Sequence, residues 1–255
     1  MSAETDCQSP PPNIDTSTLL RAAARAVDGL DLTVESAPRG STLQSLTDDP
    51  AALASVVDLY HEYHLDTFGP DTRRDISALW LLQDIAWLHA IMVIGLIPSA
   101  GASLVPSTTA IGMHFPRDFA FSVEVNPGGI GVRRIDPARR YAEPRRALTS
   151  LLAPFVSAMA GHLHAGPRAA WACVTDMASS ALSTAAQRAC LQVTHELQEF
   201  SSCPATDADR LLHGLTMRSS PSGPIRRRHG CCLLYAIGGM DVCFSCPRLP
   251  DSPAS

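Results

Sequence analysis

The chain has 255 residues, of which 45% are hydrophobic and 18% are charged, and its formal net charge is −5. This composition is typical of a globular protein, and a chain of this length can bury a sizeable core without disulfides or a structural metal to stabilise it. The acidic balance excludes a broad attraction to nucleic acid or to an anionic membrane. All 20 basic residues are arginine, which excludes Schiff-base and Walker-type chemistry because both need a lysine.

The N-terminal residues 1–14 are acidic and rich in proline, and they lack the basic and apolar regions of a secretory signal. We expect a loose tail there. Residues 85–116 contain no Asp, Glu or Arg, but Pro98 interrupts their apolar run. This run predicts a buried core helix that ends at Pro98 rather than a bilayer span. We therefore expect a cytoplasmic protein, and leave peripheral membrane association open.

Helical signals dominate the first hundred residues. Asp15 is suited to cap a helix that starts at the next residue. Residues 48–65 open with Asp before Pro and repeat apolar residues at helical spacing, and 73–97 predict a longer, more buried helix. The pattern then changes. Residues 119–135, "FAFSVEVNPGGIGVRRI", alternate on both sides of an Asn-Pro-Gly-Gly turn, which predicts an antiparallel hairpin.

Helical periodicity returns after the predicted hairpin. It predicts a helix over 145–163, one long helix or two over 168–200, and a short helix over 206–217. The fold class that follows is α+β, a mainly helical domain with a small antiparallel β-hairpin or sheet. In chain order we expect this domain at 15–218, a linker at 219–228, a cysteine-rich segment at 229–249 and a tail at 250–255.

The cysteine-rich segment reads "HGCCLLYAIGGMDVCFSCPRL" and holds Cys231, Cys232, Cys243 and Cys246 in the pattern C-C-x10-C-x2-C. Thiols that cluster in a reducing compartment suit zinc or an iron–sulfur cluster, since both favour soft ligands. Neighbouring side chains diverge, which disfavours a single zinc ion, whereas two irons offer a wider target. The spacing therefore favours iron–sulfur over zinc, and the reducing compartment places a disulfide third. Gly238-Gly239 is a turn able to bring the CxxC back to the pair.

This segment resembles the C-terminal signature of the FhuF-type ferric siderophore reductases, in which an arginine-rich approach precedes the same cysteine pattern. Trp171 and the small-residue run after it also resemble that family, and the similarity covers about residues 60–249. The family often has Gly-Asn after this Trp, where the chain has Ala172-Cys173. It usually has Ser or Thr before the cysteine pair, where the chain has Gly230.

The resemblance implies that the four cysteines bind a 2Fe–2S cluster that reduces ferric siderophores. The chain has no dinucleotide fingerprint, so the electron is expected from a separate ferredoxin or flavin reductase. Arg226, Arg227 and Arg228 precede the first cysteine; they could tune the cluster or dock a partner, or they could be a solvated linker. The other functions left open are an iron–sulfur sensor without turnover and a zinc-stabilised module.

Two further groups are weaker candidates. His61 and His64 lie one helical turn apart and could pair on a metal, but no HExxH motif is present, and polar helix-face residues are the simpler interpretation. A run of arginines around the predicted hairpin could contact an anionic siderophore or partner, although a solvated face is more usual. Its members are Arg133, Arg134, Arg139, Arg140, Arg145 and Arg146.

Overall fold

The computed structural model of the chain describes residues 15–25, 31–115, 122–204, 209–218, 225–237, 240–243 and 245–249. Both expected tails, most of the expected linker and the Gly238-Gly239 turn lie outside these residues. The described part is mainly helical with small sheets, so the predicted α+β fold class is confirmed.

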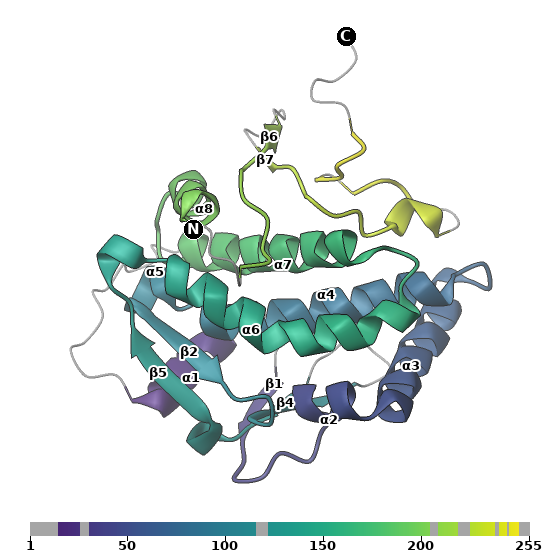
Figure 1. The fold of residues 1–255 in the computed structure, drawn as a ribbon, viewed down its shortest axis with the longest axis horizontal. Helices are drawn as coiled ribbons and strands as arrows, with labels where there is room; N and C mark the ends of the chain where they lie inside the picture. The colour runs from purple at the N-terminus through teal and green to yellow at the C-terminus, as the bar shows by residue number, and fades with distance from the viewer. Residues whose placement is uncertain are drawn as a thin grey trace, which may run out of the picture.

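Two long helices, α4 (Arg74–Val93) and α7 (Pro167–Arg188), form the centre of the fold and pack against each other. α3 (Pro50–Phe68) and α6 (Ala142–Met159) also pack against α4, and the two sheets formed by strands within residues 31–134 lie at one side of this helical body (Figure 1). α4 is mostly buried, and most of the side chains along it are apolar. The 27-residue stretch Arg74–Ala100 is long and apolar enough to cross a membrane, and 83% of its most apolar window is buried inside the protein.

The helix starts follow the capping signals in the sequence. α1 (Thr16–Arg25) begins after Asp15, whose Oδ1 accepts a hydrogen bond from the Thr18 amide at 2.8 Å. The side chain of Asp49 caps α3 in the same way, with a proline at its first position. The sequence analysis missed the short α2 (Leu43–Asp48), although Thr42 and Ser45 form a capping box there.

The helix predicted over 73–97 ends earlier than expected. α4 ends at Val93, and the short α5 (Ile97–Ala100) follows and ends at Gly101, which has a φ of 57°. A residue in this left-handed region ends helices readily when it is glycine.

The predicted hairpin is wrong in its pairing. β4 (Ser122–Val125) lies between β1 (Asp31–Val34), which runs parallel to it, and β3 (Ile111–His114), which runs antiparallel. β5 (Ile130–Arg134) instead pairs antiparallel with β2 (Ala102–Pro106). The Asn126 side chain caps the short 3-10 turn η1 (Pro127–Gly129), which carries the chain from one sheet to the other instead of folding it back.

The second half of the chain differs from the prediction in one helix. Residues 168–200 form two helices, α7 and α8 (Val193–Ser202), as one alternative expected. The short helix predicted over 206–217 is wrong across its described residues. They are irregular and end in β6 (Met217–Arg218), which pairs with β7 (Ile225–Arg226). The guanidinium of the buried Arg145 donates at 2.8 Å to the Leu211 carbonyl, which a helix would have used internally.

Candidate metal centre

The cysteine segment lies across α7 and reaches the N-terminal half of α4 (Figure 1). The indole nitrogen of Trp80, on α4, donates to the carbonyl oxygen of Cys232 at 2.9 Å. The Arg228 amide donates to the carbonyl oxygen of Ser245 at 3.0 Å, which joins the approach to the first cysteine pair with the CxxC turn. The two halves of the motif therefore meet on the helical body.

The four cysteines differ in exposure. Cys232 and Cys246 are buried, with 7% and 2% exposure, whereas Cys231 and Cys243 are partly exposed. The sulfurs of Cys232 and Cys243 are 3.9 Å apart. The Cys246 amide donates to the carbonyl of Cys243 at 2.9 Å, so the CxxC is a closed turn. One face of the motif is thus packed against protein and the other is open to solvent.

The adjacent pair is accommodated by a sharp bend immediately after it. Leu233 has a φ of 59°, a left-handed conformation that is uncommon for a leucine, and the 3-10 turn η4 (Leu234–Ala236) follows. Trp80 fixes the carbonyl of Cys232 from below. The backbone therefore changes direction just after the second cysteine.

The donor set fits a metal that prefers sulfur. Four ligands at about 2.3 Å in a tetrahedron lie about 3.8 Å from one another, close to the separation of the Cys232 and Cys243 sulfurs. Burial raises the pKa of the Cys231 thiol, and the nearby Cys246 and Cys243 thiolates raise it further. A bound cation would reverse this effect, because coordination deprotonates a thiol. The chemistry of the donor set suits a zinc ion or an iron–sulfur cluster. Among the described residues, however, no three of these sulfurs lie within 4.8 Å of one another, so the structure pairs two of the four thiols and does not gather all of them around one point.

Asp176, a residue of α7, binds the arginine-rich stretch at residues 226–230, which directly precedes the first cysteine. Its side chain is fully buried. Its two carboxylate oxygens accept hydrogen bonds from the backbone amides of His229 at 2.8 Å and Gly230 at 2.7 Å. The same carboxylate forms ion pairs with Arg226 at 2.7 Å and Arg228 at 3.5 Å. One buried carboxylate therefore contacts four of the five consecutive positions 226–230.

The protein engages the three arginines of the approach in different ways, and they do not form a solvated charge run. The Arg227 guanidinium donates to the carbonyls of Pro247 and Leu249, which follow the last cysteine. Arg228 also donates to Oε1 of Gln83, on α4, at 2.5 Å. Burial lowers the pKa of Arg228, but Asp176 and the thiolates of the segment raise it more, so the net shift is upward. Arg228 is therefore a fixed, partly buried cation beside the sulfurs.

Gly230 packs directly onto the backbone of α7. A Cβ atom at this position would lie 2.7 Å from the sulfur of Cys173, 2.9 Å from the amide nitrogen of Cys173 and 3.2 Å from the carbonyl carbon of Ala172. Cys173 is buried, and its sulfur lies 4.0 Å from the carbonyl oxygen of Cys231. Burial raises the pKa of Cys173 to about 12, so it is a neutral thiol beside the motif.

The sequence analysis missed Asp176, Trp80, Gln83 and Cys173. Their contacts with the segment span 50 residues or more of sequence, so no local pattern could reveal them. The one available signal was Asp176 itself, a lone carboxylate among the small residues of α7. A buried charge must be paired, and the arginines before the cysteines were the candidates.

His61 and His64 are explained by the core. Nδ1 of His64 lies 2.9 Å from Oγ of Ser77, and His61 approaches the same hydroxyl at 3.4 Å. His64 is fully buried against the ring of Trp80, and burial lowers its pKa to about 4. A neutral, packed imidazole accounts for this pair without a metal.

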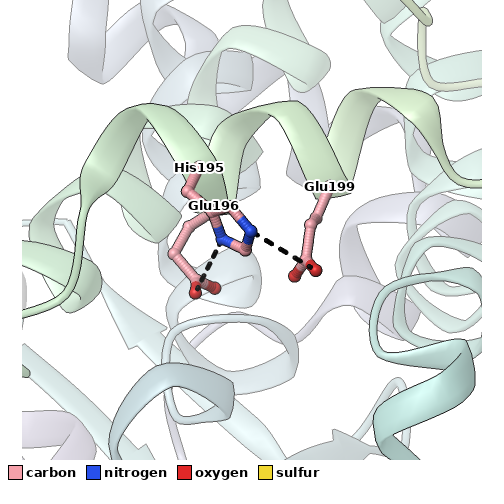
Figure 2. Close-up of side chains that lie close together, drawn as sticks. All are labelled: His195, Glu196 and Glu199. Atoms are coloured by element: carbon pink, nitrogen blue, oxygen red, sulfur yellow. Dashed lines mark ion pairs between the residues drawn. The ribbon is translucent and has the colours of Figure 1, made fainter.

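Among the described residues, His195, Glu196 and Glu199 of α8 have potential metal-ligand atoms that all lie within 4.8 Å of one another (Figure 2). The guanidinium of Arg140 is already 2.9 Å from Glu196 and 3.6 Å from Glu199, and the hydroxyl of Tyr141 also donates to Glu196. An arginine therefore supplies the positive charge here, and we assign no metal to the group.

The arginines around the predicted hairpin do not form one surface. Arg145 is fully buried and pairs with Asp209 at 2.8 Å. Arg140 is held by α8, as described above. Neither guanidinium is available to a siderophore, so the alternative of one solvated basic face is also wrong for these two residues.

Neither a scan against models of known protein families nor a search among curated proteins finds a match to the chain.

Proposed function

We propose that the chain is a 2Fe–2S protein that reduces ferric siderophores by one electron in the cytoplasm. The observation that carries this proposal is the docking of the cysteine segment on α4 and α7, with Cys231 and Cys243 partly exposed and Cys232 and Cys246 buried. A cluster bound there would be shielded on one side and would present its other edge to a second molecule.

The contacts of Gly230 support the resemblance on which the proposal also rests. The chain departs from the family's pattern at Gly230 and at Ala172-Cys173, and these positions touch. A side chain at position 230 would press on the sulfur and amide nitrogen of Cys173, so the glycine before the cysteine pair fits closely against this part of α7. Two departures that fit together are consistent with the same docking geometry, reached with different residues.

A bound 2Fe–2S cluster supplies one electron at a time. The chain's own residues hold the four thiolates, shield two of them and place the Arg228 cation nearby. The substrate is Fe(III) bound by hard oxygen donors, which hold Fe(II) far more weakly, so one electron loosens the metal without breaking the chelator. No proton donor or nucleophile is required for this reaction.

The partners follow from the same geometry. A ferric siderophore is bulky and must meet the site at the surface, where Tyr235, Met240 and Val242 of the same segment are exposed. The electron donor, a ferredoxin or flavin reductase, needs to approach the same partly exposed sulfurs. We leave nucleic acid out of the proposal, and association with a membrane surface stays open.

Zinc is a second candidate, because a sulfur separation of 3.9 Å suits two ligands of one zinc ion as well as two ligands of one iron. A zinc-bound protein would be a structural module and not a reductase. An iron–sulfur sensor uses the same ligands and differs only in the absence of turnover.

Air-free purification followed by a reoxidation assay tests all three functions. We expect a brown protein with about two irons and two sulfides per chain, which after reduction is reoxidised by hydroxamate, catecholate or carboxylate ferric siderophores while a ferrous chelator captures Fe(II). A colourless protein that holds zinc would overturn the cluster. A brown protein that none of the three siderophore classes reoxidises would identify the sensor.

A further inference from the structure

We propose that Asp176 is a positioning residue that holds the cysteine segment on α7 and sets the charge that Arg228 presents to the sulfurs. The part of this inference that concerns the reduction potential rests on the proposed 2Fe–2S function. The part that concerns the fold of the segment does not, and the two parts can be tested separately.

The first step is the grip on the backbone. Asp176 uses both carboxylate oxygens, one for the amide of His229 and one for the amide of Gly230. These amides directly precede Cys231, so their position fixes where the adjacent pair begins. Charge-assisted hydrogen bonds to a fully buried carboxylate are among the stronger contacts in proteins, and no water competes for them.

The second step is the arrangement of charge. Asp176 pairs with two guanidinium groups, Arg226 at 2.7 Å and Arg228 at 3.5 Å. Their exposed side-chain fractions are 13% and 11%, so solvent screens them little. One negative charge between two positive charges leaves the group with a net positive charge. Gln83 holds the Arg228 head from the other side, which keeps it between α4 and α7.

The third step links this charge to the sulfurs. Arg228 interacts electrostatically with Cys232 and Cys243, the two sulfurs 3.9 Å apart. A cation near a cluster favours the form that carries an extra electron, and an anion disfavours it. Asp176 and Arg228 should therefore act on the potential with opposite signs, although both help to hold the same segment.

The opposite effects of Asp176 and Arg228 on the reduction potential distinguish an electrostatic role from a merely structural one. We expect the midpoint potential of Asp176→Asn to move upward and that of Arg228→Gln to move downward. Each shift should be at least tenfold in the reduction equilibrium, about 59 mV for one electron. Redox titration followed by electron paramagnetic resonance measures both. The control is Glu196→Gln, which removes an equally buried, arginine-paired carboxylate on α8 and should leave the potential unchanged.

Hydrogen exchange on cluster-free protein tests the grip without any metal. In wild type the amides of His229 and Gly230 should be protected; in Asp176→Asn they should exchange at least tenfold faster, and in Glu196→Gln at the wild-type rate. Unchanged exchange in Asp176→Asn, or potentials of Asp176→Asn and Arg228→Gln that shift in the same direction, would overturn the proposal. A colourless wild-type protein would end the proposed function, and exchange alone would then decide the role of Asp176.

Discussion

Replacing Gly230 with alanine should lift the cysteine segment away from α7. The new Cβ would lie 2.7 Å from the sulfur of Cys173 and 2.9 Å from the Cys173 amide nitrogen, and contacts below 3.0 Å force atoms to move. The helix backbone cannot yield, so the segment must. Gly230 does not have a positive φ, so alanine suits its backbone and the expected cost is purely steric.

The cost can be estimated from these contacts. Overpacking of this kind costs roughly 1–3 kcal/mol, and a displaced segment would also weaken the hydrogen bond from the Gly230 amide to Asp176. We expect local opening of the segment to become easier by about 2 kcal/mol, or roughly 30-fold. Hydrogen exchange of the segment measures this directly, and the iron retained per chain reports the consequence for the site.

Two further variants make the prediction specific. Adding Cys173→Ala to Gly230→Ala removes the 2.7 Å contact but not the one at 2.9 Å, so protection should recover only in part. Gly161→Ala is the control, because a Cβ there meets no atom within 4 Å, and it should change stability by no more than about 0.5 kcal/mol. Wild-type exchange in Gly230→Ala, or a double variant no better protected than the single one, would refute the reasoning.

Three other outcomes follow from the described residues. Burial raises the pKa of Asp84 to about 7 from an unfolded value of 3.8, so its contribution to stability is fully present below pH 3.8 and is lost as the pH rises through 7. Between pH 4 and 8 the free energy of unfolding of Asp84→Asn should therefore rise relative to that of wild type by up to about 4 kcal/mol. A difference between the two proteins that does not change with pH would contradict the raised pKa. In cluster-free protein, limiting diamide should link Cys232 to Cys243 first, as their 3.9 Å separation implies, and peptide mapping that finds another first pair would count against it. Arg145→Met removes the guanidinium partner of the buried Asp209 carboxylate, which then keeps His213 at 3.5 Å, and should cost about 3–5 kcal/mol in urea unfolding. Arg145→Met/Asp209→Leu should restore only part of this, because the carbonyls of Phe200 and Leu211 still lose their donor.

Local signals predicted the starts of two helices. Asp15 and Asp49 each mark a helix start, because an acidic side chain satisfies free amides within three residues of itself. The break after Val93 was harder to foresee. The sequence stays apolar beyond it, and the helix stops where Gly95 and the short α5 turn the chain toward the sheet.

Strand pairing could not be read from the sequence in the same way. The alternation around Asn126 correctly marks two strands, but alternation does not say which partner each strand takes. β4 is largely buried and needs neighbours on both edges, which β1 and β3 supply from elsewhere in the chain. The helix expected over 206–217 failed for a similar reason: the buried guanidinium of Arg145, more than 60 residues earlier, binds that backbone.

The candidate site, too, was predictable from local sequence only in part. The cysteine pattern predicts a soft-metal site from spacing alone, whereas the residues that fix its geometry come from α4 and α7. This division explains how two adjacent cysteines can serve one centre. Their side chains diverge, so the backbone around them must be held from both sides. Asp176 grips it one residue before Cys231, and Trp80 grips it at the carbonyl of Cys232. The direction of the two sulfurs therefore depends on the contacts that α4 and α7 make with the backbone on either side of the pair.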